Sequence, residues 1–219
     1  MAKILWDQTG TRFYEAGVDH GVVYVMDPAT AEYKEGVAWN GLTSVNEAPE
    51  GAEATPMYAD NIKYVSITSA EDFKFTIEAF TYPEEFEACD GKGTLGAGIS
   101  ATQQARSSFA FTYRSKIGND ITEDAGYKIH LVYGAKAGVS SVDRATINES
   151  TEGVAFSWEC STTPITIAGV DKPTAHIIFD SRTVSPAVLA ALELKLYGDE
   201  TAEPGMPTPT ELASIIATA

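Results

Sequence analysis

The chain has 219 residues with 44% hydrophobic and 21% charged side chains, which is enough apolar material for a buried core and excludes a fully disordered protein. Its 31 acidic against 15 basic side chains give a formal net charge of −16, which argues against a protein that grips nucleic-acid phosphates. No run approaches the roughly 20 apolar residues of a membrane span, and no signal-peptide core follows the N-terminus, so we expect no membrane association.

Strands are predicted along most of the chain, because apolar and polar residues alternate with a period of two. The alternation is clearest at residues 73–79, 109–113, 127–133 and 154–160. Further strands are predicted at residues 20–26, 33–39, 62–68, 143–148 and 175–179. These short strands are separated by turn residues and show no run of βαβ units, so they favour a mainly β protein, an antiparallel sandwich or barrel.

Helices are few. One is predicted over residues 83–88, where a proline precedes two acids that suit a helix N-terminus, and Gly91 follows as terminator. Another runs from Ser185 as N-cap to Gly198, although residues 191–197 also alternate and fit a closing strand.

The C-terminal end differs from the rest in composition. Residues 204–209 are rich in proline and indicate a linker, after which Thr210 is expected to cap a short amphipathic helix around Leu212, Ile215 and Ile216. We therefore predict a domain over residues 1–200 and a tail over residues 201–219.

Residues 41–61 show no periodicity and are expected to form a long loop, either disordered or ordered on a partner by burying Met57 and Tyr58. This loop lies in the most acidic stretch of the chain. Residues 41–90 contain eleven acids and two bases, a net charge of −9.

No catalytic, metal or cofactor site is predicted. The glycine-rich residues 90–98 lack the order of a phosphate-binding loop, and the serine pairs lack a GxSxG elbow. Adjacent acids at residues 84–85 and 71–72 read as solvated charges rather than as a catalytic carboxylate dyad. His20, His130 and His176 stand alone on strand-like segments with no HExxH pattern, so we expect core or surface histidines rather than ligands or bases. The thiols of Cys89 and Cys160 are expected to be reduced and buried. We therefore expect no enzyme.

Several segments resemble a known family. Residues 58–64 (YADNIKY), 69–73 (SAEDF) and 77–86 (IEAFTYPEEF) resemble the signature of major tail proteins, or tail tube proteins, of long-tailed non-contractile bacteriophages. The resemblance continues through residues 111–120, 127–134 and 156–159 and the PTPTEL sequence at 207–212, so it covers most of the chain.

This resemblance implies an antiparallel β-sandwich with a flanking α-helix and a long loop. It implies hexameric rings that stack into the hollow tube through which the genome leaves, in a virion assembled in the bacterial cytoplasm. The implied partners are other copies of this chain, the tape measure protein, the tail terminator and distal tail or baseplate proteins, while DNA passes without specific binding. No cofactor is implied.

In this family the long loop contacts the neighbouring ring. The residues expected to make inter-ring or inter-subunit contacts are Gly41, Asn46, Met57, Tyr58, Asp60, Asn61, Tyr64, Phe80, Tyr82 and Phe86. A tube that carries DNA must not bind phosphate tightly, because each neutralised phosphate adds affinity. We therefore expect acids on the inner wall, with Glu71, Asp72 and Glu78 as candidates.

Two other classes of protein remain open. A carbohydrate- or receptor-binding β-sandwich of a virion or cell surface would present an aromatic platform from Trp6, Trp39 or Trp158, or a calcium cage of carboxylates. A small hydrolase on a jelly-roll scaffold would need a catalytic constellation, which the sequence does not show. Tubes or rings in electron microscopy would favour the tail protein.

Overall fold

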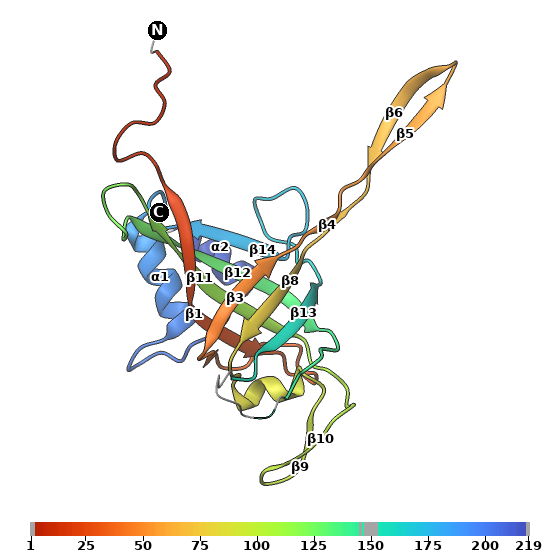
Figure 1. The fold of residues 1–219 in the computed structure, drawn as a ribbon, viewed down its shortest axis with the longest axis vertical. Helices are drawn as coiled ribbons and strands as arrows, with labels where there is room; N and C mark the ends of the chain where they lie inside the picture. The colour runs from red at the N-terminus through yellow and green to blue at the C-terminus, as the bar shows by residue number, and fades with distance from the viewer. Residues whose placement is uncertain (1–2, 145, 147–152, 218–219) are drawn as a thin grey trace.

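The computed structural model describes residues 3–144, 146 and 153–217, and this part of the chain is mainly antiparallel β-structure (Figure 1). The main sheet contains β1 (Tyr14–Val25), β2 (Val37–Ala38), β3 (Leu42–Glu47), β8 (Lys74–Ala79), β11 (Phe109–Gly118), β12 (Gly126–Ala137), β13 (Phe156–Thr162) and β14 (His176–Asp180). Smaller two-stranded sheets pair β4 (Glu50–Gly51) with β7 (Glu71–Asp72), β5 (Ala54–Ala59) with β6 (Ile62–Thr68) and β9 (Gly93–Gly96) with β10 (Ile99–Ala101). The helices are the 3₁₀-helix η1 (Glu84–Ala88), α1 (Pro186–Tyr197) and α2 (Pro209–Ile216).

The main sheet bends into two layers. Its strands run in the order β2, β1, β11, β12, β13, β8, β3, and β14 also pairs with β12. Strand β12 pairs with β14 through residues 128–132 and with β13 through residues 135–137, so the sheet divides along this strand. Strand β3, at the far edge, contacts β1. The antiparallel sandwich predicted from the sequence is confirmed.

The space between the layers is filled by aromatic side chains. Trp39 lies against Phe86 and Trp158, with ring centroids 4.6 Å and 5.4 Å away. Both indole N–H groups are satisfied: Trp39 donates to the Thr81 carbonyl at 2.9 Å and Trp158 to the Asp90 carboxylate at 3.0 Å. Buried indoles need such partners, so this core specifies ring positions as well as apolar volume.

The other face of β12 is covered by the helices. Val188, Leu192 and Leu196 recur every four residues and form one buried stripe of α1. This stripe shares a core with Ile129 and Leu131 of β12. The four-residue spacing explains why residues 191–197 form a helix rather than the alternative strand. Ser185 caps the helix, its hydroxyl accepting a hydrogen bond from the Val188 amide at 3.4 Å.

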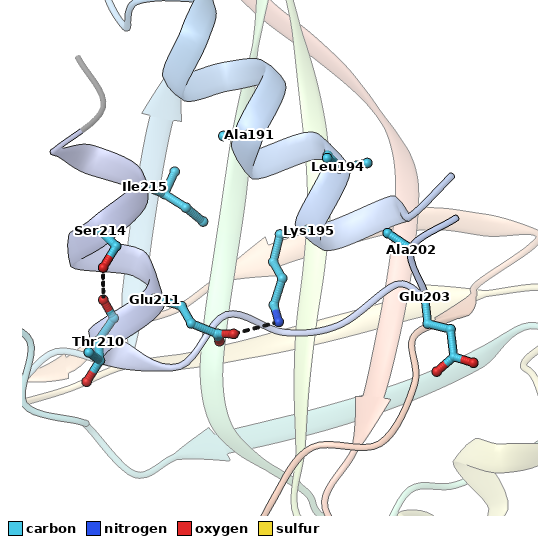
Figure 2. Close-up of a pocket in the computed structure, with 9 residues that line it drawn as sticks. All are labelled: Ala191, Leu194, Lys195, Ala202, Glu203, Thr210, Glu211, Ser214 and Ile215. Atoms are coloured by element: carbon cyan, nitrogen blue, oxygen red, sulfur yellow. Dashed lines mark hydrogen bonds and ion pairs between the residues drawn. The ribbon is translucent and has the colours of Figure 1, made fainter. Parts of the chain in front are cut away.

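The C-terminal residues dock on this same side. Met206 and Leu212 are buried with α1, and Figure 2 shows Lys195 of α1 reaching Glu211 of α2, 2.9 Å away. The expected cap at Thr210 is wrong by two residues. Thr208 is the N-cap, because its hydroxyl accepts from the Glu211 amide while the Glu211 carboxylate accepts from the Thr208 amide. Residues 204–209 therefore lead into a capped helix that packs on the sheet.

Three other local predictions need correction. Residues 33–39 contain only the short strand β2 and a single bridge at Tyr33, because the Gly36 amide donates to the Pro204 carbonyl at 2.9 Å rather than to a strand. The helix predicted over residues 83–88 is the 3₁₀-helix η1, which begins at Glu84 with Pro83 as its N-cap rather than its first residue. In the predicted strand at 143–148, residues 143, 144 and 146 are not in a strand, and the others lie outside the described residues.

Candidate functional site

Residues 50–72 form a β-ribbon, here called the arm, that projects from the main sheet (Figure 1). The expectation of a structureless loop over residues 41–61 is wrong, since that segment supplies β3, β4 and β5. Strand pairing explains the difference: β3 and β4 pair with the more distant strands β8 and β7, and β5 pairs with the next strand, β6. All side chains of β5 and β6 are exposed.

The tip of the arm is a two-residue turn. Asp60 and Asn61 connect β5 to β6 with φ angles of +50° and +62°. Positive φ at both central residues is the requirement of the tight turn whose twist matches a hairpin, and Asp and Asn tolerate it better than most residues. The two residues that the resemblance marks as contacts are thus also the residues that close the hairpin.

One face of the arm is apolar. Met57 pairs with Val65 and Thr55 with Ile67, and directly opposed residues of alternate pairs share a face. Ala59 and Ile62 continue this face beyond a bulge near Tyr64. The exposed large apolar side chains on the face are Met57, Ile62, Val65 and Ile67. An isolated two-stranded hairpin is marginal in water, so a partner that covers this face would stabilise the arm.

The base of the arm is well defined. Gly51 has a φ of +86°, and a Cβ there would lie 2.4 Å from the Ala70 carbonyl oxygen, so only glycine fits. Lys74 Nζ lies 2.6 Å from the Glu50 carboxylate. The candidate acids Glu71 and Asp72 are exposed on β7 of this base.

Other exposed apolar side chains lie on two further projections. The β9–β10 hairpin, which carries exposed Leu95 and Ile99, extends from the end of the molecule opposite the arm (Figure 1). The N-terminal segment exposes Leu5 and Trp6 and is tied to the sheet where the Gly10 amide donates to Asp120 at 2.9 Å. The molecule therefore presents apolar groups at both ends of its long axis.

The predicted contact residues fall into two groups. Met57, Tyr58, Asp60, Asn61 and Tyr64 are exposed on the arm, while Asn46 and Gly41 are exposed on or beside β3. Phe80 is exposed next to Gly41, whose carbonyl accepts a hydrogen bond from the Phe80 amide at 2.9 Å.

Phe86 and Tyr82 are less exposed than the other predicted contact residues. Phe86 is the fully buried residue of η1, so the prediction that it contacts another subunit is wrong. Tyr82 is half-buried, its ring 5.2 Å from Phe156, and Lys92 donates a hydrogen bond to its hydroxyl. The segment between β8 and η1 turns back toward the core, and the local sequence does not predict this turn.

The candidate lumen acid Glu78 lies on the outward face of β8. Its neighbours Phe75, Ile77 and Ala79 point into the core, and Glu78 accepts a hydrogen bond from the Ser44 hydroxyl at 2.8 Å. Glu159, on the adjacent strand β13, is also exposed. An aromatic binding platform would need exposed tryptophans. Trp39 and Trp158 are both buried in the core, whereas Trp6 is exposed.

His130 is a core histidine, as the sequence predicts, but the structure brings it together with His176, from which it is separated in the sequence. They come from the paired strands β12 and β14, and His130 Nδ1 lies 3.0 Å from His176 Nε2 and 3.4 Å from Glu47 Oε1. Burial lowers the pKa of His130 to about 4 and lowers that of His176, which keeps both rings neutral near pH 7. The two histidines are 46 positions apart in the sequence and meet because β12 pairs with β14. No local sequence motif predicts this contact.

The thiols behave as expected, since Cys89 and Cys160 are both buried and free. Burial raises the pKa of Cys89 to about 12, so this thiol stays protonated. Within the described residues, no helix has the length and apolar character to cross a membrane.

No family model matches the chain, and no curated protein matches it. Among solved structures, it is similar to a chain in the six-fold symmetrised cryo-EM structure of the anti-feeding prophage (AFP) baseplate. That likeness has 7% sequence identity and a TM-score of 0.37, and it covers 75% of this chain and 95% of the other. At this level the likeness carries no functional argument.

Proposed function

We propose that this chain is a structural protein of a bacteriophage virion, a subunit that assembles with its own copies into stacked hexameric rings of a tail tube. The observation that carries the proposal is the arm, an exposed hairpin with one apolar face. The arm includes the YADN sequence at 58–61, part of the segment that most resembles tail tube proteins.

The shape of the subunit supports stacking. The arm and the β9–β10 hairpin lie at opposite ends, so contact between one subunit and the next along an axis joins different surfaces (Figure 1). Head-to-tail contacts of this kind do not close on themselves and generate extended assemblies. The edge strands β2 and β3 offer unpaired backbone groups for lateral neighbours within a ring.

The charge supports a conduit for DNA. The outward face of β8 and β13 carries exposed Glu78 and Glu159, and we propose that it lines the lumen. Like charge repels the duplex from the wall and allows it to slide, whereas basic residues would bind phosphates through counterion release. Glu71 and Asp72, at the base of the arm, would lie near the junction between rings.

The role is structural rather than enzymatic. The tape measure protein would occupy the lumen before ejection, and the tail terminator and distal tail or baseplate proteins would bind the two ends of the tube. Each of these partners follows from the resemblance of the sequence.

Electron microscopy of the purified protein over a series of concentrations tests the proposal. The wild-type chain should form rings or tubes. A variant in which Asn-Gly replaces residues 53–69 joins Ala52 to Ala70, which already pair through a backbone hydrogen bond of 3.3 Å, by a two-residue hairpin turn. It should fold and fail to stack. Normal tubes from this variant would show that the arm is not the contact between rings. Wild-type protein that stays monomeric at all concentrations would contradict the proposal that the chain forms a tail tube.

A further inference from the structure

Three side chains of metal-ligand type converge at the end of the core nearest the arm. Glu47 is the last residue of β3, His130 lies within β12 and His176 begins β14. One ligand atom from each lies within 4.8 Å of the others, and His130 Nδ1 lies 3.0 Å from His176 Nε2 and 3.4 Å from Glu47 Oε1. A tetrahedral ion with bonds of about 2.0–2.1 Å holds its ligand atoms roughly 3.3 Å apart.

The hydrogen bonds assign the tautomer of His130. The Ser115 hydroxyl lies 3.1 Å from His130 Nε2 and donates its single hydrogen to Glu15 at 2.5 Å. Because that hydrogen is used, His130 Nε2 must carry a hydrogen and donate to Ser115. Neutral His130 then has a bare Nδ1, which accepts a hydrogen bond from His176 Nε2 at 3.0 Å when no metal is bound. His176 can bind a metal through Nε2 only as the tautomer that carries its proton on Nδ1, which lies 3.8 Å from Glu47 Oε2. A ligating histidine whose other nitrogen donates to a polar partner is the usual arrangement in metal sites.

The surrounding side chains hold the other ligands in place. Tyr113 donates a hydrogen bond to Glu47 Oε1 at 2.6 Å, and its ring stacks on His130 with centroids 4.4 Å apart. Phe73 stacks on His176 with centroids 4.5 Å apart. All three candidate ligands are therefore oriented by contacts within the protein itself.

We propose that Glu47, His130 and His176 bind a divalent transition-metal ion. Zn²⁺ is the ion used to test the proposal. Two imidazole nitrogens with one carboxylate suit zinc and its first-row neighbours, whereas Ca²⁺ and Mg²⁺ prefer oxygen ligands alone. The histidine side chains are only 5% and 10% exposed, but that of Glu47 is 37% exposed, so the ion enters from the Glu47 side and retains a position for water.

Such an ion would brace the arm. Two residues separate Glu47 from the base of the arm, and Phe73, stacked on His176, follows the arm directly. The metal would thus join β3, at the entrance to the arm, to the paired strands β12 and β14. This inference rests on the ligand geometry and holds whether or not the arm joins rings.

Metal binding by the full chain tests the proposal. Protein treated with EDTA and then freed of chelator is titrated with Zn²⁺ against a chromophoric indicator, and separately with Co²⁺, whose absorption reports its coordination. We expect one equivalent of Zn²⁺, a Co²⁺ spectrum of low coordination number, and a rise in Tm with Zn²⁺ because the ion binds only the folded chain. Hydrogen exchange at the base of the arm should slow with Zn²⁺.

Matched variants separate this site from incidental binding. His176→Gln should bind Zn²⁺ at least tenfold more weakly, and Ser115→Ala should lose roughly 10–100-fold, as expected for a residue that orients a ligand. His20→Gln, at an exposed histidine paired with Asp19, should bind as the wild type does. A wild-type dissociation constant weaker than about 100 μM, near −5.5 kcal/mol, would overturn the proposal. Binding of Zn²⁺ by His176→Gln as tight as that of the wild type would overturn it too. If His176→Gln does not fold, Glu47→Gln takes its place in this comparison.

Discussion

The apolar face of the arm gives a quantitative prediction for assembly. The perturbation is the double substitution Ile62→Thr and Ile67→Thr, which keeps β-branched side chains in the strand but removes apolar surface. In the subunit these side chains are 63% and 56% exposed. Complete burial of an isoleucine is worth about 1.5–3 kcal/mol, so covering the exposed part of each contributes about 1–2 kcal/mol. Threonine keeps one methyl group, so each substitution should lose about 1–1.5 kcal/mol of this contribution.

The two substitutions together should therefore weaken each arm contact by about 2–3 kcal/mol, which is roughly a 30- to 150-fold rise in the critical concentration for assembly. The free energy of unfolding of the subunit should change by less than about 0.5 kcal/mol, because the replaced side chains are exposed before assembly. Sedimentation across a concentration series measures the first quantity, and urea denaturation the second.

The control is Ser66→Thr with Thr68→Ser, in the same strand but on the opposite face of the arm. This control should assemble at the wild-type concentration. An unchanged critical concentration for the isoleucine variant, or an equal rise for the control, would refute the assignment of the apolar face to an inter-subunit contact.

Three further predictions concern the core, the C-terminal helix and the acidic face. Leu192→Ala removes a fully buried side chain between α1 and the sheet and should cost about 2–5 kcal/mol in urea denaturation. Hydrogen bonds from Lys195 and from the Thr208 cap of α2 lower the pKa of Glu211. The stability that ionised Glu211 adds to the fold is therefore complete above the ordinary glutamate pKa and is lost as the pH falls through the lowered value. Glu211→Gln should remove this pH dependence from thermal unfolding. Glu78→Lys should still permit tubes but slow genome ejection from virions, most strongly at low salt, where the Debye length is about 10 Å at 0.1 M against about 3 Å at 1 M.

The candidate site shows how far local patterns reach. The segment at 58–64 resembles tail tube proteins, and its tyrosines Tyr58 and Tyr64 are exposed on the arm as expected for contact residues. The same resemblance marked Phe86, which is buried, because the turn after β8 folds back beneath the sheet. Exposure depends on packing between distant segments, so it cannot be read from the residues of one segment.

The sequence by itself determined those features that depend on interactions between residues close together in the chain. The alternation at 73–79 predicted β8, and Ser185 and Gly198 marked the two ends of α1, because pleats and caps are local interactions. Only the tertiary structure decided that β3 pairs with β8 and β4 with β7, that His130 meets His176, and which face of β8 Glu78 occupies. These arrangements depend on strand register between distant segments, and a shift of one residue moves every side chain to the opposite face of a sheet.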